Sequence, residues 1–146
     1  MIAASLAACS SDSHTPEQRV RAVIEAMEIA VESGSVKQTS ALLAETYSDG
    51  WHPNKRAAIG SLFAYLRRHR SVHLFVLIKS IELGAEANTA NAVAYVAMTG
   101  VPVRSVETLF SLKADLYRFD VRLSSVDGEW RVSGSRWERA SLTVLE

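Results

Sequence analysis

The hydrophobic positions in the first part of the chain recur every three or four residues, a spacing typical of amphipathic helices. The sequence TPEQ predicts a helix start, because Thr15 is a good N-cap, Pro16 fits the first helical position and Gln18 can close a capping box. The helix is expected to end before Gly34. Its apolar stripe consists of Val20, Val23, Ile24, Met27, Ala30 and Val31.

Two further helices are predicted after the first. A short one covers 36–45 and ends just before Tyr47. Residues 49–53, DGWHP, then form a connection, because glycine and proline interrupt any periodic pattern. The third helix runs over 54–70. The inward side chains of these two helices are Leu42, Leu43, Ile59, Leu62, Phe63 and Leu66.

The pattern changes to extended structure after Ser71. Residues 73–83, HLFVLIKSIEL, and 92–99, AVAYVAMT, are rich in aliphatic and aromatic side chains and are separated by a turn-like stretch, so both are predicted strands. Residues 100–114 form a long connection that contains a short amphipathic turn and could cap a pocket.

A β-hairpin that turns at Asp127 and Gly128 completes the pattern, since these residues fit the two positive-φ positions of a type I′ turn. Without a bulge, the register puts Trp137 beside Arg118 on the polar face. One extra residue at Gly134 would move Trp137 to the apolar face, and the sequence leaves both registers open. Along LYRFDVRLSSV one face carries Tyr117, Phe119, Val121 and Leu123, and the other carries Arg118, Asp120 and Arg122.

The strand predicted over 73–83 has apolar side chains on both faces, whereas a half-solvated antiparallel strand alternates. Its second face therefore needs a cover, and we expect a homodimer formed through the sheet. The two sets of side chains are Phe75, Leu77 and Ile81 on one face and Leu74, Val76 and Ile78 on the other.

Composition narrows the function classes. The chain has 146 residues, the length of one domain, and its 16 basic and 16 acidic residues give a formal net charge of zero, which argues against nucleic-acid binding. One cysteine allows neither an internal disulfide nor a cysteine-based zinc site. The four histidines, at 14, 52, 69 and 73, lack a recurrent ligand spacing, so neither a metal nor another cofactor is expected.

The first nine residues, MIAASLAAC, are small and apolar, and a polar run follows. Their end, LAAC, resembles the bacterial lipobox, in which a leucine and two small residues precede a cysteine that becomes diacylated. No Lys or Arg precedes the short apolar run, so it is interpreted as a truncated signal segment, with a frayed N-terminus and an idle cysteine as the alternative. The resemblance implies that Cys9 is the lipid attachment site.

The expected organisation is a truncated lipoprotein signal segment and short linker over 1–15, a domain over 16–140, and a C-terminal tail over 141–146. Two or three acyl chains hold a protein on a bilayer where one would not. Because Ser10 follows the cysteine, the lipobox resemblance implies an outer-membrane lipoprotein of the bacterial cell envelope that faces the periplasm. The anchor would be its only membrane contact, and without acylation the chain would be soluble.

The order of three helices followed by a four-stranded antiparallel meander indicates an α+β fold. This order, together with LLAETYSDG after the second helix and DLYRFDVRLSSVDGEWRVSGSRW near the end, resembles the nuclear transport factor 2-like (SnoaL-like, cystatin-like) superfamily. The resemblance implies a cone in which three N-terminal helices pack on a curved four-stranded antiparallel sheet. That superfamily includes dehydratases, isomerases, ligand-binding modules and interaction domains, so the fold does not fix the activity.

The resemblance also implies a pocket between the helices and the sheet, for which the sequence offers five lining candidates. An enzyme could pair His73 with Tyr47 or present Asp120 to the pocket. Asp120, however, lies between two arginines on the polar face and is interpreted as part of a surface charge row, so no catalytic residue is assigned. The lining candidates are Tyr47, Trp51, His73, Tyr95 and Trp137.

The leading hypothesis is a membrane-anchored lipoprotein whose non-catalytic, cone-shaped domain binds a small, partly apolar ligand or an envelope protein. The first alternative is a lyase or isomerase of the ketosteroid isomerase or dehydratase type that uses a pocket His, Tyr or Asp. The second is a purely structural dimeric interaction module. An open apolar pocket favours ligand binding, two convergent titratable groups favour chemistry, and a filled cone favours interaction alone.

Overall fold

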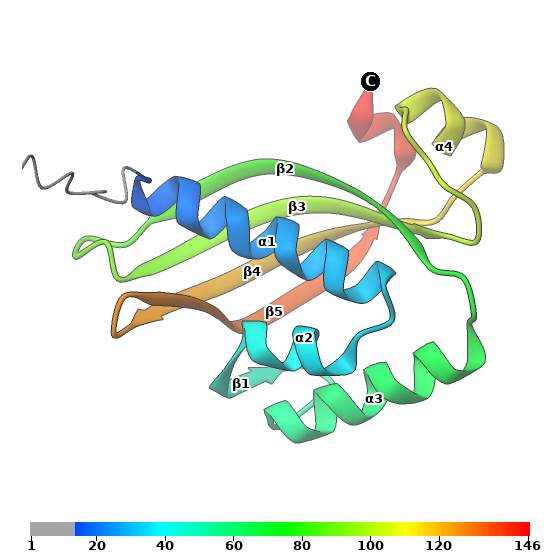
Figure 1. Cartoon of the computed structure of the whole chain (residues 1–146). Coiled ribbons are helices and arrows are strands. Elements are labelled where there is room, and N and C mark those ends of the chain that lie inside the picture. Colours follow the sequence, from blue (N-terminus) through cyan, green and yellow to red (C-terminus); the bar gives the residue numbers. More distant parts are fainter. Residues whose placement is uncertain (1–13) are drawn as a thin grey trace, which may run out of the picture.

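The computed structural model describes residues 14–146, and its centre is a five-stranded mixed sheet with the strand order β1-β5-β4-β3-β2 (Figure 1). The four later strands form an antiparallel meander, and β1 pairs in parallel with β5. The strands are β1 (Leu43–Asp49), β2 (His73–Leu83), β3 (Thr89–Thr99), β4 (Leu116–Val126) and β5 (Glu129–Ala140).

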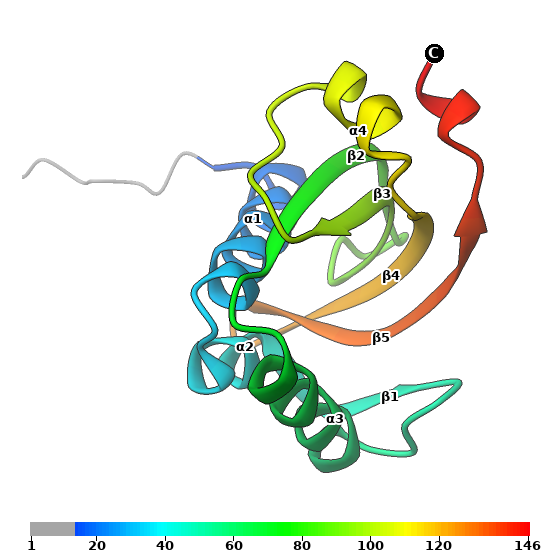
Figure 2. The same cartoon turned by 90° about the vertical axis from the view of Figure 1, so that its right-hand side faces the viewer.

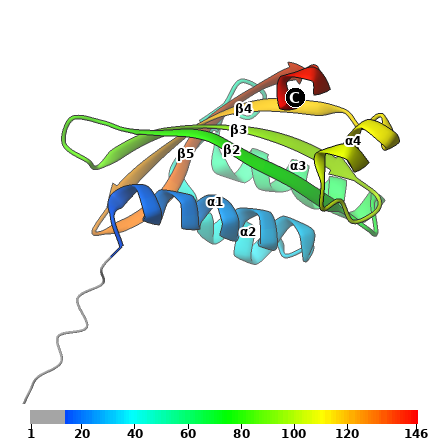
Figure 3. The same cartoon turned by 90° about the horizontal axis from the view of Figure 1, so that it is seen from above.

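Three helices pack inside the bend of the sheet, and shorter elements lie at one end of its outer face (Figure 2). Figure 3 shows α1 and α2 running along one side of the sheet. The helices of the inner layer are α1 (Pro16–Glu32), α2 (Val36–Leu42) and α3 (Lys55–Arg68). The outer elements are α4 (Val106–Leu112) and the 3-10 helix η1 (Leu142–Leu145). The predicted α+β class and the three leading helices are confirmed.

Local capping explains where the helices begin. The predicted capping box at the start of α1 is present, with Thr15 Oγ1 accepting from the Gln18 backbone N–H at 3.2 Å and Gln18 Oε1 accepting from the Thr15 N–H at 2.8 Å. At the start of α3, the Asn54 side chain accepts from the Ala57 N–H at 2.9 Å. Each cap satisfies backbone donors that the first helical turn leaves without partners.

The sheet differs from the four antiparallel strands that we predicted, because residues 43–49 form a fifth strand. We expected the second helix to continue to residue 45, whereas α2 ends at Leu42. Helix propensities are differences of a few tenths of a kcal/mol per residue, and tertiary contacts override them. Here Leu43 and Tyr47 are buried, and the backbone of β1 pairs with β5.

The hairpin turns at Asp127 and Gly128, whose φ values of 54° and 79° confirm the predicted turn residues. Leu123 faces Val132 as expected, and the register then shifts by one residue, at Ser133. This bulge settles the register that the sequence left open, since Trp137 faces Phe119 on the inner face of the sheet.

Gly134, just after the bulge, lies beneath the exposed side chain of Arg122, which would have to move to admit a larger residue. A Cβ atom there would lie 2.3 Å from the Arg122 guanidinium, which crosses over it from β4.

The outer face has a small core of its own, because α4 and η1 pack over the ends of β3 and β4. Segment 100–114 therefore covers the outer face and does not cap the inner cavity, and the expected C-terminal tail contains η1. Phe75 of β2 packs into this core, so part of the strand's second apolar face is covered within the chain, while Leu77 remains 43% exposed. The buried members of the core are Tyr95, Ala97, Leu109 and Leu116.

Within residues 14–146, none of the helices is both long enough and apolar enough to cross a bilayer. The predicted lipobox and Cys9 lie outside the described residues.

Candidate functional site

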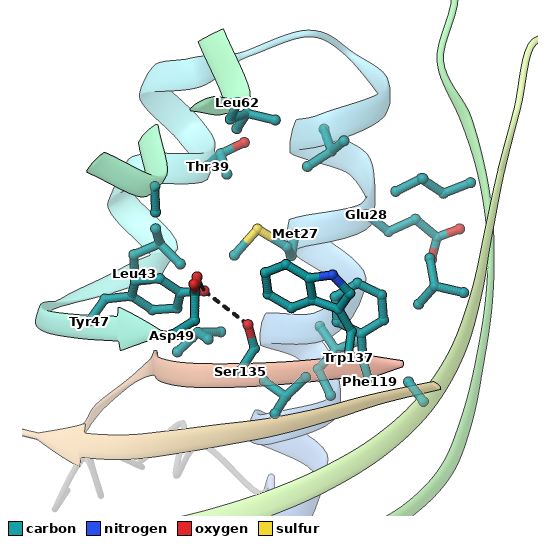
Figure 4. Close-up of a pocket in the computed structure, with 18 of the residues that line it drawn as sticks. Met27, Glu28, Thr39, Leu43, Tyr47, Asp49, Leu62, Phe119, Ser135 and Trp137 are labelled. Atoms are coloured by element: carbon teal, nitrogen blue, oxygen red, sulfur yellow. Dashed lines mark hydrogen bonds between the residues drawn. The ribbon is translucent and has the colours of Figure 1, made fainter. Parts of the chain in front are cut away.

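A cavity of about 470 Å³ lies between α1, α3 and the inner face of the sheet (Figure 4). Cavities of a few hundred Å³ with mostly apolar walls are typical of small-molecule sites. Its apolar side chains come from the helices and from all five strands. They include Ile24, Met27, Val31, Leu43, Ile59, Leu62, Leu74, Val76, Ala94, Val96, Met98, Phe119, Val121, Val132 and Trp137.

The position of the cavity follows from the inner side chains of β3. Ala90 and Ala92 are small, and Val20 of α1 packs with them into a closed core with Leu123. Ala94 continues this series of small residues farther along β3, where it lines the cavity. A short side chain at a position that faces no packed helix leaves space, so the cone is filled at one end and open at the other.

One end of the cavity carries an organised polar group made by Tyr47, Asp49, His52 and Ser135. Figure 4 shows Tyr47, Asp49 and Ser135 close together. The Tyr47 hydroxyl donates to Asp49 Oδ2 at 2.6 Å. Since its one proton is used there, the Ser135 hydroxyl donates to the Tyr47 oxygen at 2.9 Å. Tyr47 is buried, and both bonds are partly buried in the cavity wall.

The Asp49 carboxylate is held from several sides. Oδ1 accepts from the backbone N–H groups of Trp51 and His52, each at 2.8 Å, and His52 Nδ1 lies 2.9 Å from both carboxylate oxygens. The side chain of Asp49 is 1% exposed. The β1–α3 connection that contains these residues is tied down at its far end by Lys55, whose Nζ donates to the Leu43 carbonyl at 3.1 Å.

These bonds set the protonation states of Asp49 and Tyr47. Burial by itself raises the pKa of Asp49, but the hydrogen bonds from Tyr47, His52 and the two backbone N–H groups outweigh it and leave the pKa below its usual value. Burial and the bond to Asp49 raise the pKa of Tyr47 far above its usual value. Asp49 is therefore ionised and Tyr47 protonated at neutral pH, and Asp49 acts as an organising group rather than as a base.

Asp49 also orients His52. When Nδ1 donates to the carboxylate, Nε2 carries the lone pair and accepts from the Ser61 hydroxyl, 2.9 Å away. The three side chains have the connectivity of a serine hydrolase triad, but Ser61 lies within α3, where backbone N–H groups are bonded to the preceding turn. The backbone N–H groups around Ser61 are therefore not free to bind an oxyanion, so the arrangement can support proton transfer by His52 rather than nucleophilic attack by Ser61.

Glu28 of α1 is the other ionisable group of interest in the cavity wall, and in Figure 4 it lies across Met27 and Trp137 from Tyr47 and Asp49. Its pKa is raised, first by burial and then by the charges of Glu32 and Glu25. The cavity is thus apolar in the middle with a polar group at each side.

Of the five residues predicted to line the pocket, two line the cavity and three do not. Tyr47 and Trp137 line the cavity, Trp137 because of the bulge at Ser133. Trp51 is 77% exposed and does not line it. Neither His73 nor Tyr95 is part of the lining, and Tyr95 is buried in the outer core.

The two catalytic pairings considered from sequence are not formed. His73 begins β2 outside the cavity lining, so it does not join Tyr47 there. Asp120 lies between two cavity-lining residues of β4 and therefore faces outward, where it is 3.7 Å from Arg118. The structure therefore supports the interpretation of Asp120 as part of a surface row of charged side chains.

Sequence reasoning missed the residues that organise the site: Asp49, His52, Ser135 and Glu28. The connection DGWHP did contain a signal, because an Asp that accepts from the N–H two residues ahead is a common turn device. The bond to Tyr47 depends on β1, which the local pattern did not predict.

The sequence matches no protein-family model and no curated protein. Among solved structures, an uncharacterized protein with a cystatin-like fold from Caulobacter vibrioides has a TM-score of 0.68 at 13% identity, covering 87% of this chain and 91% of that one. A candidate dehydratase of the NTF2-like family from Streptomyces avermitilis has a TM-score of 0.64 at 12% identity, covering 86% and 96%. Bd1075 from Bdellovibrio bacteriovorus has a TM-score of 0.66 at 8% identity, covering 85% of this chain, which spans only 40% of that chain.

These similarities confirm the cystatin-like, nuclear transport factor 2-like fold that the sequence predicted. At such low identities they show the fold alone. The chemistry has to be argued from the cavity itself.

Proposed function

We propose that this chain is a ligand-binding domain whose cavity takes a small, mostly apolar molecule and offers fixed polar side chains at its two sides to the polar groups of that molecule. The observation that carries the proposal is an open apolar cavity of about 470 Å³ with a few fixed polar groups in its wall. This combination is the usual character of a small-molecule site. Solved structures of the same fold include a candidate dehydratase and proteins of unknown function, which fits a ligand-binding or enzyme-like role.

The wall also offers a flat aromatic surface. Phe119 and Trp137 stack with ring centroids 5.5 Å apart, and both line the cavity. Aromatic rings provide a large contact area at little conformational cost, so an extended apolar body is well accommodated against them.

The test is titration with N-phenyl-1-naphthylamine, an uncharged dye that fluoresces in apolar sites. We expect saturable binding that falls at least about tenfold in Ala94→Phe and Val96→Phe, which fill the cavity. Leu77→Phe, on the outer face, is the matched control and should bind as the wild type does. Absence of dye binding by folded wild-type protein, or unchanged binding in both cavity variants, would reject the proposal in favour of a protein-interaction module.

The second candidate function is acid–base catalysis of the dehydratase or isomerase type by His52. It is favoured by one observation, the two Asp49 oxygens that hold Nδ1 and direct Nε2 toward the cavity edge. The test is to incubate the protein with a panel of β-hydroxyketones and unsaturated ketones and detect products by mass spectrometry. Turnover that is lost in His52→Gln would support it, and no turnover across the panel would favour binding alone.

We further propose that the domain is anchored in the outer membrane of a bacterial envelope through acylated Cys9, facing the periplasm. The support is the resemblance of LAAC to a lipobox at the one cysteine of the chain. Cell fractionation of wild type and Cys9→Ser, each expressed from the full gene, tests it. Equal partition of the two proteins into membranes would contradict acylation.

Homodimer formation through the outer face of the sheet is likewise proposed. Its support is the exposed Leu77 of β2, beside the part of that face that α4 and η1 cover. Light scattering at micromolar concentration should give twice the chain mass, and Leu77→Lys should reduce it to the monomer. A monomeric wild type would refute the dimer.

A further inference from the structure

Apart from His52, which Asp49 holds, the ionisable side chains of the cavity wall are acids. The full set is Glu28, Tyr47, Asp49, His52 and Tyr65, and among residues 14–146 no Lys or Arg lines the cavity. A carboxylate or phosphate ligand would therefore lose its water without gaining a cationic partner, which is costly in an apolar site.

The charge of Asp49 is already compensated. Four hydrogen-bond donors surround it: the Tyr47 hydroxyl, two backbone N–H groups and His52. Asp49 is thus an internal part of the fold and has little capacity left for a ligand.

Glu28 lacks such compensation. Burial raises its pKa first, followed by the charges of Glu32 and Glu25 and a hydrogen bond with the Glu32 side chain, so the side chains that act on it are two further carboxyl groups. Glu28 and Glu32 are one helical turn apart, where like charges destabilise a helix. Glu32 is turned toward β2, where its Oε1 accepts from the Leu74 N–H at 3.4 Å. Glu28 consequently presents to the cavity a carboxyl group that needs a positive partner.

The far polar group also favours a ligand that donates. The Tyr47 proton is committed to Asp49 and the Ser135 proton to Tyr47, so what Ser135 has left is the capacity to accept. Both polar sides of the cavity therefore present acceptors.

The aromatic wall suits a cation as well. In the view of Figure 4, the rings of Trp137 and Phe119 lie between Asp49 and Glu28. Ammonium groups are attracted to aromatic faces, and to Trp most strongly.

We propose that the cavity selects amphiphilic molecules that carry a protonated or quaternary amine, whose positive charge pairs with Glu28 and whose apolar body lies against Trp137 and Phe119. The inference deepens the proposed ligand-binding function and depends on it. It names a chemical class, cationic amphiphiles, and one residue, Glu28, that sets the preference.

The experiment measures how well matched decyl compounds displace N-phenyl-1-naphthylamine from the full chain. Decylamine and decyltrimethylammonium should displace the dye at concentrations at least about tenfold lower than decanoate, with decan-1-ol between them. In Glu28→Gln the amines and the alcohol should become nearly equal, while the affinity for decan-1-ol stays within about twofold of wild type. Glu107→Gln, which removes an exposed helical glutamate on the outer side of the sheet, is the control and should keep the full preference.

The outcomes separate the inference from the proposed function. If the dye binds but the four compounds compete equally, the charge selection is wrong and the ligand-binding function stands. If Glu28→Gln weakens all four compounds to the same degree, Glu28 is a structural residue and the inference falls. If the dye does not bind at all, both fall together.

Discussion

Phe119 of β4 and Trp137 of β5 stack on the inner face of the sheet, with ring centroids 5.5 Å apart and planes inclined by 22°. They are cross-strand partners because Ser133 adds one residue to β5 between the turn and Trp137. A one-residue change of register moves every later side chain to the other face. The bulge is therefore what puts an aromatic wall into the cavity.

Replacement of Trp137 should affect both binding and stability. Trp137→Ala removes part of the cavity wall, so we expect affinity for N-phenyl-1-naphthylamine to fall about tenfold and the free energy of unfolding to fall by about 1–3 kcal/mol, less than for a fully buried Trp. Trp51→Ala is the control, because Trp51 is 77% exposed and outside the cavity. Equal effects of the two substitutions on dye binding would show that the aromatic wall is not part of the site.

The hydrogen bond between Tyr47 and Asp49 should contribute more to the free energy of unfolding than the hydrogen bond between Ser135 and Tyr47. Tyr47→Phe leaves a buried carboxylate with one donor fewer, so the free energy of unfolding should fall by about 1.5–3 kcal/mol. Ser135→Ala removes a neutral bond to the same hydroxyl and should cost about 0.5–1.5 kcal/mol. Urea denaturation measures both, and a larger loss in Ser135→Ala would contradict the greater weight given to the Tyr47–Asp49 bond.

The two cavity carboxyl groups predict opposite pH dependences. The pKa of Asp49 is lower in the folded chain than in the unfolded one, so its ionisation stabilises the fold above the unfolded pKa of about 4, and that stabilisation is lost as the pH falls through the folded pKa. The difference in unfolding free energy between wild type and Asp49→Asn should accordingly be largest near neutral pH and shrink in acid.

For Glu28 the sign is reversed. Its pKa is raised in the folded chain, so ionisation destabilises the fold as the pH rises from the unfolded pKa of about 4 through the folded value. Glu28→Gln should be more stable than wild type at neutral pH, with the advantage disappearing below about pH 4. Chemical denaturation over pH 3–8 tests both carboxyl variants, and a slope of the same sign for the two would contradict the assignment.

The outer core predicts a stability effect that is separate from ligand binding. Leu109 of α4 is fully buried against Tyr95 and Leu116, so Leu109→Ala should lower the free energy of unfolding by about 2–5 kcal/mol. Leu112→Ala, on the same helix but 46% exposed, should cost less than about 1 kcal/mol. Thermal unfolding followed by circular dichroism gives both values. Dye affinity of the folded variants should remain at the wild-type level, because α4 lies on the other face of the sheet.

Much of the fold could be predicted because its signals are local. The capping box at Thr15 and Gln18 determined the start of α1, and alternation along β4 with Asp127 and Gly128 determined the hairpin. Strand β1 gave no such signal, since its seven residues show no clear alternation and its pairing partner is β5, which lies far along the chain.

The site was harder to predict because it depends on long-range pairing and on which face a side chain takes. Tyr47 meets Asp49 and Ser135 only once β1 is a strand beside β5. Tyr95 was expected to line the cavity and instead belongs to the outer core, and only the packing of α4 shows which face of β3 is which. Trp137 depended on a bulge that a sequence with Gly134 permits but does not require.

The parallel pairing of β1 with β5 also affects the order in which the parts of the chain fold. Tyr47 and Ser135 are 88 residues apart, and closing so long a loop is entropically costly until the intervening strands have ordered. We therefore expect these residues to meet in the last steps of folding, so a chain still emerging from the ribosome would possess most of its helices and its first strands but not the completed cavity. The cavity would then form abruptly, when the final strand joins the sheet.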